Sequence, residues 1–174
     1  MIAKPHHILL RPRGRIGRPS FVAGVVALVA LSTLATVVMR ALDPGTAAGF
    51  WFGLAAWFVL LPLMLCSVFV QRLHDMGRTA WPFTALIAGV MLILIGVMLA
   101  HGGAEYFNAF SQFERKEAID PDVVAQLQAD YRAEMANAGQ PLSLILSVVL
   151  GGFTLWLALA RGQGEPNAYG PPTG

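Results

Sequence analysis

Residues 71–78 hold the densest set of side chains that could take part in chemistry: Arg72, His74, Asp75 and Arg78 all lie in this short stretch. Catalysis by His74 and Asp75 is not expected, because neighbouring residues on a helix do not face each other and no Ser or Cys nucleophile lies beside them. The sequence therefore predicts that the protein is not an enzyme and has no catalytic residues.

A metal site in this region would need His6, His7 and His74 to meet. That arrangement requires the N-terminal segment to fold over residues 71–78 and to supply ligands in tetrahedral geometry. We expect neither a metal site nor a cofactor.

The properties of a helix end explain the same stretch more simply. Arg72 and Asp75 stand three positions apart, so they can form an ion pair on one helical face. Gly77 suits the position just after a helix, where left-handed backbone is needed, and the basic residues before it complement the negative end of the helix dipole. We expect a helix to end here.

Further arginines precede the first apolar segment, and with residues 71–78 they predict a cationic rim at the level of the lipid headgroups. Such a rim can hold anionic phospholipid or a protein partner, with each basic residue contributing about 1 kcal/mol. The alternative is that these residues only anchor the topology and cap a helix. The candidate binding residues are Arg15, Arg18, Arg72, His74, Asp75 and Arg78.

Four apolar stretches must position this rim. The 12 basic and 10 acidic residues fall into five patches, and each gap between patches is long enough to cross a bilayer, which takes roughly 20 residues. The predicted membrane spans are residues 21–39, 47–70, 81–100 and 142–160.

The composition agrees with a membrane protein, because 56% of the residues are hydrophobic, 13% are charged and the mean hydropathy is +0.60. Continuous apolar runs favour helices over the alternating strands of a barrel. We predict an all-α, integral membrane four-helix bundle over residues 1–161. Residues 162–174, rich in Gly and Pro, are predicted to form a flexible cytoplasmic tail.

The basic N-terminal segment followed by an apolar run is also the pattern of a cleaved signal peptide. Residues 19–39 carry no charge, however, and this run is longer than the roughly 7–15 residues of a signal peptide core. A first membrane span is the favoured interpretation.

The distribution of Lys and Arg predicts the orientation. Five of these residues lie before the first span, two lie in residues 72–78 and one, Arg161, follows the last span, against Arg40 and three in residues 101–141 on the opposite side. Because basic residues are retained preferentially on the cytoplasmic side, both termini are predicted to be cytoplasmic.

The connection over residues 101–141 is acidic, with seven Asp and Glu against three basic residues. Asp120 before Pro121 predicts a helix start, and Gly139 with Pro141 predicts a stop. Apolar residues at spacings of three and four between them predict an extracytoplasmic amphipathic helix. This helix is either a docking or sensing surface, or it lies on the membrane or on the bundle.

Two residues in the spans have structural roles. Pro62 deprives the Phe58 carbonyl of its helical partner and is expected to bend the second span, as a fixed kink or as a hinge. Trp81 is expected to anchor the third span at the membrane interface. The predicted spans contain no ionisable side chain of the Asp, Glu, Lys, Arg or His type, which disfavours an ion-coupled transporter.

Three stretches resemble the domain of unknown function 805 family of small bacterial inner-membrane proteins. They are Gly14-Arg15-Ile16-Gly17-Arg18-Pro19-Ser20-Phe21, Arg72-Leu73-His74-Asp75-Met76-Gly77-Arg78-Thr79-Ala80-Trp81 and Asn167-Ala168-Tyr169-Gly170-Pro171. The central stretch resembles the family's R-L-H-D-x-G-R-S-G-W, with Thr79 and Ala80 where Ser and Gly are usual. The resemblance implies a bacterial cytoplasmic membrane location and cytoplasmic termini, and it implies no activity.

The sequence as a whole predicts a non-enzymatic, multi-pass protein of the bacterial inner membrane whose cationic cytoplasmic rim binds anionic lipid headgroups or a protein partner. The alternative function is a small transporter or channel subunit that acts as an oligomer. The expected partners are membrane lipids, among them anionic phospholipid, and a second copy or another membrane protein. No nucleic acid partner is expected.

Overall fold

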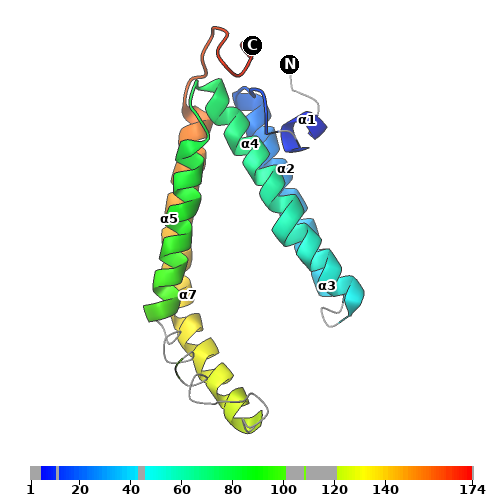
Figure 1. Ribbon diagram of the computed structural model, residues 1–174, viewed down its shortest axis with the longest axis vertical. Helices are drawn as coiled ribbons and strands as arrows, with labels where there is room; N and C mark the ends of the chain where they lie inside the picture. The colour runs from blue at the N-terminus through cyan, green and yellow to red at the C-terminus, as the bar shows by residue number, and fades with distance from the viewer. Residues whose placement is uncertain (1–4, 11, 43–45, 101–107, 109–120, 174) are drawn as a thin grey trace. The chain divides into compact units, whose positions relative to one another are not determined.

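A computed structural model of the protein describes residues 5–10, 12–42, 46–100, 108 and 121–173 (Figure 1). Over these residues the secondary structure is helical, apart from one isolated bridge between Asn167 and Gly170. The helices are α1 (Pro5–Leu10), α2 (Arg18–Ala41), α3 (Ala47–Gly53), η1 (Leu54–Leu60), α4 (Leu61–Asp75), α5 (Trp81–Met98) and α7 (Pro121–Leu159). The predicted all-α class is confirmed.

Four helical stretches are long and apolar enough to cross a membrane, which indicates a multi-pass membrane protein. They are Arg18–Ala41, Ala47–Asp75, Trp81–Met98 and Pro141–Leu159, each with a mean hydropathy of 2.2 to 2.4 over its most apolar window. They coincide with the four predicted spans. The second stretch continues as a helix beyond its predicted end, so residues 71–75 belong to α4.

The chain divides into two compact units, Met1–Phe83 with Thr154–Gly174, and Thr84–Phe153. The C-terminal tail thus groups with the first two spans. Polar contacts join the tail to the end of α4. The predicted boundary between a membrane domain at residues 1–161 and the tail stays a prediction.

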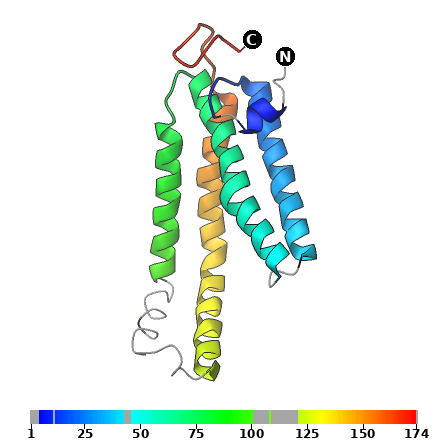
Figure 2. The ribbon, with the colours of Figure 1, turned by 45° about the vertical axis from the view of Figure 1, so that its right-hand side comes forward.

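Close packing of α2 against α4 forms the core of the first unit, and the two helices run side by side in Figures 1 and 2. The Phe21 and Phe69 rings meet edge to face with their centroids 5.5 Å apart. Gly24 allows this approach, because a Cβ at its position would lie only 3.1 Å from the Val68 side chain. Closely packed apolar side chains gain dispersion energy from their contacts, so this packing holds α2 and α4 together.

The helical hydrogen bonding of the second span is irregular in the segment just before Pro62. Helices α3, η1 and α4 follow one another without a break, and η1 is a π-helix in which hydrogen bonds reach back five residues. The Leu61 N–H, for example, donates to the Ala56 carbonyl oxygen. Pro62 follows inside this continuous helical stretch, where its missing N–H would free a backbone carbonyl, and a local π-helical adjustment is one way in which membrane helices satisfy such groups.

The predicted stop at Gly139 and Pro141 is wrong, because α7 runs from Pro121 to Leu159 through both residues. A proline inside a helix removes a single backbone hydrogen bond, and the long apolar stretch after Pro141 retains the helix in its place. The predicted amphipathic helix is therefore the first part of α7 and not a separate element. The residues just before Pro121 lie outside the described residues, so its predicted start at Asp120 and Pro121 is not tested, and its extracytoplasmic location stays a prediction.

A candidate charged site at the end of helix α4

Helix α4 ends in a Schellman motif that fixes the backbone of the candidate site. The Arg78 N–H donates to the Leu73 carbonyl oxygen at 2.9 Å, and the Gly77 N–H donates to the His74 carbonyl oxygen at 3.0 Å. Gly77 has φ of +71°, the left-handed conformation that this motif needs. The predicted C-cap role of Gly77 is confirmed.

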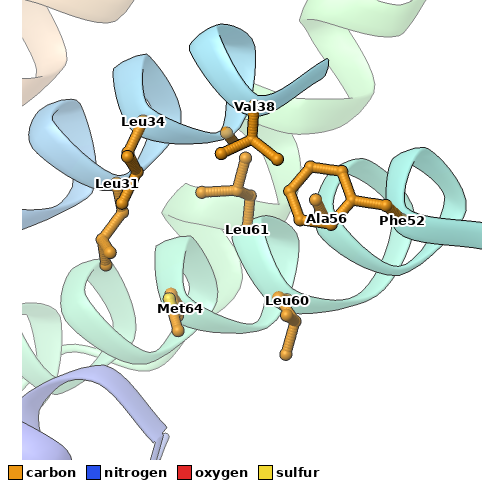
Figure 3. Close-up of a pocket in the computed structure, with 9 residues that line it drawn as sticks. Leu31, Leu34, Val38, Phe52, Ala56, Leu60, Leu61 and Met64 are labelled. Atoms are coloured by element: carbon orange, nitrogen blue, oxygen red, sulfur yellow. The ribbon is translucent and has the colours of Figure 1, made fainter. Parts of the chain in front are cut away.

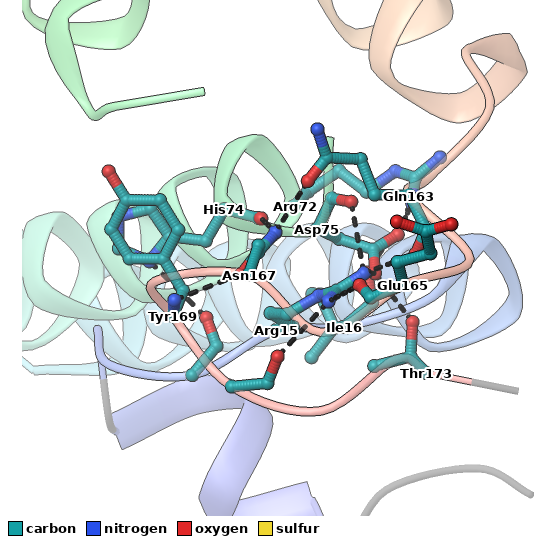
Figure 4. A network of polar contacts seen from close by, with 12 residues as sticks. Arg15, Ile16, Arg72, His74, Asp75, Gln163, Glu165, Asn167, Tyr169 and Thr173 are labelled. Carbon is teal, nitrogen blue, oxygen red and sulfur yellow. Dashed lines mark hydrogen bonds and ion pairs between the residues drawn. The ribbon is translucent and has the colours of Figure 1, made fainter. Parts of the chain in front are cut away.

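Three charged side chains are buried beside this helix end, and we call Arg15, Arg72 and Asp75 the charge cluster (Figure 4). Arg72 is 0% exposed, Asp75 is 2% exposed and Arg15 is 9% exposed. Arg72 pairs with one carboxylate oxygen of Asp75, while Arg15 lies 3.3 Å from the other. One buried carboxylate therefore serves two guanidinium groups, and the predicted Arg72–Asp75 ion pair is confirmed.

The last carbonyl groups of α7 supply further acceptors. Arg72 donates from Nε to the Leu157 carbonyl oxygen at 2.9 Å and from Nη2 to that of Ala160. Arg18, which is exposed, donates from Nε to the same Ala160 oxygen at 2.9 Å. Carbonyls at a helix C-terminus lack partners within their own helix and carry the negative end of its dipole, so two arginines satisfy and neutralise this end of α7.

The C-terminal tail completes the surroundings of Arg15. The Arg15 guanidinium donates to the carbonyl oxygens of Gln163, Glu165 and Gly170, the last two at 2.9 and 3.2 Å. Thr173 donates from its hydroxyl to Asp75 Oδ1 at 2.6 Å. The tail thus contributes backbone oxygens to the buried cation and a hydroxyl to the buried anion.

Two glycines let the tail approach this closely. A Cβ on Gly162 would overlap the Asp75 carboxylate, and a Cβ on Gly77 would overlap the Gln163 side chain. The Gln163 N–H donates to the Asp75 backbone carbonyl oxygen at 2.8 Å. A side chain at Gly162 would meet the buried, paired Asp75 carboxylate and push the tail away from α4, whereas one at Gly77 would meet only the flexible end of the exposed Gln163 side chain.

His74 joins the N-terminal segment and the tail on the other side of α4. Its Nδ1 lies 3.2 Å from the Gly14 carbonyl oxygen, and since a carbonyl only accepts, Nδ1 carries the hydrogen in this contact. Its ring stacks on Tyr169 with centroids 3.7 Å apart and planes 4° from parallel. Asn167 donates to the His74 carbonyl oxygen at 2.9 Å.

The six candidate rim residues do not form one surface. Arg15, Arg72 and Asp75 are buried, His74 is half-buried, and Arg18 and Arg78 are exposed. Burial depends on which distant carbonyls a guanidinium reaches, and spacing along the chain does not encode this. Headgroup binding by these residues stays a prediction, and the exposed arginines are the ones with access to a headgroup.

Sequence reasoning missed the tail residues that surround the charge cluster. Gln163, Asn167, Tyr169 and Thr173 lie in a stretch whose Gly and Pro content predicts only an irregular segment. The one signal for them is the string of residues 167–171, noted above for its family resemblance. Polar side chains between glycines in an otherwise irregular tail can mark such a docked segment.

The residues placed by the structure contain no group of three His, Cys, Asp or Glu close enough to hold a metal ion. The side chains of His6 and His7 lie outside the described part of the chain, so the metal site rejected on sequence grounds is not tested. Trp81 begins α5 and is 73% exposed, and its role as an interfacial anchor stays a prediction.

Comparison with known protein families gives a match over residues 9–112 to the family described as "Protein of unknown function (DUF805)". The matched range contains Arg15, Arg72 and Asp75, whereas the tail that covers them lies beyond it. No curated protein and no solved structure matches the chain.

Proposed function

We propose a function at the membrane surface for this chain, which belongs to the DUF805 family. It is a non-enzymatic protein of the bacterial cytoplasmic membrane, and its exposed arginines bind anionic phospholipid headgroups around the buried charge cluster. The charge cluster itself has a structural task, which is to join the N-terminal segment, α4 and the tail.

The division of the arginines between buried and exposed positions is the observation that carries this proposal. Arg15 and Arg72 donate to carboxylate and carbonyl oxygens inside the protein, so a headgroup has no access to them in this conformation. Arg18 and Arg78 are exposed and lie at the same helix end: Arg18 donates to Ala160, and the Arg78 guanidinium lies 5.3 Å from the centre of the Trp156 ring.

Further exposed arginines flank this pair. Arg13 precedes Arg15 by two residues, and Arg161 follows the end of α7. Each basic residue near an anionic membrane surface contributes about 1 kcal/mol. Four arginines around one helix end therefore favour a leaflet that contains anionic lipid.

The orientation with both termini in the cytoplasm is supported by the polar contacts. Arg15 from the N-terminal segment and Gln163 and Thr173 from the tail meet at the C-terminal end of α4. Both ends of the chain therefore belong to the same side of the membrane, the side that carries most of its Lys and Arg. Reporter fusions at both termini test this part: activity of a periplasmic reporter at either end would contradict it.

The headgroup proposal is tested with the double variant Arg18→Gln and Arg78→Gln, purified in a mild detergent. We expect the copurified anionic phospholipid, measured by mass spectrometry, to fall severalfold while the fold is retained. Arg132→Gln, which removes an exposed arginine from α7, is the matched control and should leave the lipid content unchanged. Unchanged anionic lipid in the folded double variant would refute headgroup binding at this site.

A further inference from the structure

The charge cluster carries more positive than negative charge. Arg15 and Arg72 bring two guanidinium groups, and within the described part of the chain they share one carboxylate, that of Asp75. Arg72 pairs with Oδ2 of this carboxylate. Arg15 donates to Oδ1 from Nε and Nη2 at 3.3 Å, which is longer than the about 2.7–2.9 Å of a strong charge-assisted hydrogen bond. The charge of Arg15 is therefore the less compensated of the two.

The tail covers Arg15 with neutral oxygens. The Arg15 guanidinium donates to three tail carbonyls, those of Gln163, Glu165 and Gly170 (Figure 4). Glu165 contributes its backbone oxygen here and is itself exposed. Backbone carbonyls carry no net charge, so the tail satisfies the hydrogen bonds of Arg15 without neutralising it. A buried charge is stable only when both needs are met.

A phosphate group fits this guanidinium better than the tail does. The planar fork of an arginine binds phosphate oxygens in pairs, and a phosphate adds the negative charge that carbonyls lack. Repulsion from Asp75 is weak, because Arg72 pairs with its carboxylate. Arg13 and Arg18 are exposed within three positions of Arg15, so a phosphate that reaches Arg15 enters a region of positive charge.

The tail is attached in a way that allows it to detach. No residue in the described range 161–173 is buried, so polar contacts and one ring stack hold the tail instead of apolar burial. Two of these contacts reach His74: Asn167 donates to its carbonyl oxygen, and the Tyr169 ring stacks on its side chain. Hydrogen bonds of this kind can be exchanged for bonds to water at modest net cost.

The segment that carries Arg15 is held independently of the tail. Ile16 is 2% exposed, and its N–H donates to the Gln71 carbonyl oxygen at 3.4 Å. Arg72 donates from Nη1 to the Ile16 carbonyl oxygen at 3.4 Å. Detachment of the tail would therefore uncover Arg15 while the guanidinium stays beside the end of α4.

We propose that the tail covers a phosphate-binding site centred on Arg15, and that a phosphate group replaces the tail carbonyls when the tail detaches. The phosphate belongs to an anionic lipid headgroup or to a small soluble compound, and the recognition chemistry is the same for both. The proposal rests on the proposed function only in its class of ligand, because Arg15 is separate from the exposed pair Arg18 and Arg78. The tail acts as an internal competitor, so binding tightens as the tail is loosened.

The test loosens the tail with the double variant Asn167→Ala and Tyr169→Ala, which removes two contacts to His74. Phosphatidylglycerol is titrated into the full-length protein in a mild detergent, and native mass spectrometry gives the dissociation constant. We expect about tenfold tighter binding than in the unmodified protein, because a larger fraction of the molecules has an uncovered site. Ala168→Ser, at an exposed position between the two changes, is the matched control and should bind like the unmodified protein.

Phenylglyoxal, which modifies accessible arginines, measures the exposure of Arg15 directly when the labelled peptides are identified by mass spectrometry. We expect Arg15 to be unreactive in the unmodified protein, reactive in the double variant, and protected again by phosphatidylglycerol. Inorganic phosphate at the same phosphate concentration is the second arm of this experiment. Protection by both ligands would support a site for soluble phosphate compounds, and protection by the lipid alone would support a headgroup site.

Arg15→Gln added to the double variant should remove the tenfold gain. Arg18→Gln with Arg78→Gln should instead lower lipid binding with or without the tail changes and leave the gain intact, so failure of the proposed function is distinguishable from failure of this site. A gain that survives Arg15→Gln would overturn the proposal, and so would an Arg15 that stays unreactive, or reacts without protection, in the double variant. If the Arg15→Gln variant does not fold, the protection of Arg15 from phenylglyoxal decides.

Discussion

The two ends of the first two spans are held together in different ways. At the C-terminal end of α4, three buried charged side chains make directional bonds to the N-terminal segment, to the end of α7 and to the tail. At the α2–α3 end, the surfaces are apolar and leave a groove between α2 and η1 (Figure 3). Buried charges demand partners at fixed positions, whereas apolar surfaces demand only that their volume be filled. We therefore expect the charged end to tolerate substitution poorly and the apolar end to tolerate it well.

The largest effect is expected from Asp75→Asn, which leaves Arg15 and Arg72 buried without their counter-charge. Breaking a buried ion pair typically costs about 3–5 kcal/mol, so the variant should unfold at a much lower temperature in detergent. Asp130→Asn, at an exposed position on α7, is the control and should change stability by less than about 0.5 kcal/mol. Equal unfolding temperatures for Asp75→Asn and Asp130→Asn would contradict the expectation that the charged end tolerates substitution poorly.

Next in size are Gly77→Ala and Gly162→Ala, which place a Cβ where the tail approaches α4. At Gly77 the left-handed backbone alone costs an alanine about 1–2 kcal/mol. Gly162→Ala should release the tail through its clash with the Asp75 carboxylate, and Gly77→Ala should loosen it by straining the backbone at the end of α4. Both variants should speed trypsin cleavage after Arg161, followed by mass spectrometry.

Gly164→Ala is the matched control for these two variants, because a Cβ there meets nothing within 4 Å. Faster cleavage in this control as well would mean that the loss of glycine flexibility, and not close approach, explains the effect.

A smaller effect is expected from the contact between His74 and Tyr169. Stacked rings typically contribute about 0.5–1.5 kcal/mol beyond the burial of their area. A double-mutant cycle with His74→Ala and Tyr169→Ala, measured by thermal unfolding, should give a coupling energy in this range. Strictly additive effects would show that the stack contributes nothing.

The smallest effect is expected from Pro62→Ala at the apolar end. Pro62 is exposed and follows a π-helix that accommodates its missing N–H, so replacing it should change stability by less than about 0.5 kcal/mol. Thermal unfolding beside Asp75→Asn provides the comparison. A loss as large as that of Asp75→Asn would show that the apolar end is as sensitive as the charged one.

Local patterns predicted much of the structure. The four spans follow from the length of the apolar runs, and the ion pair of Arg72 with Asp75 follows from their spacing of three. The cap at Gly77 follows from the need for left-handed backbone after a helix. Each of these features depends on residues in one continuous stretch of the chain, and the four apolar helices, the ion pair and the cap are confirmed. The resemblance of residues 14–21 and 72–81 to the DUF805 family is also confirmed, because the family match covers both stretches.

Other features could not be predicted because they depend on the competition between elements. Pro141 favours a helix end by itself, yet α7 continues because the apolar stretch after it supplies many helical hydrogen bonds against one lost. The apolar groove depends on how α2 packs beside η1. From the sequence, Pro62 indicated only a bend in the second span. The docking of the tail depends on Arg15, which lies 148 positions from Gln163.

The amino-acid sequence by itself determined which segments are apolar helices, because a backbone in hydrocarbon must satisfy its own hydrogen bonds and only long apolar runs allow this. It also determined where α4 ends. The tertiary structure alone decided which arginines are buried and which face the surroundings. A guanidinium can be buried only where acceptors converge, and for Arg72 and Arg15 these include carbonyl oxygens 56 to 155 positions away in the chain.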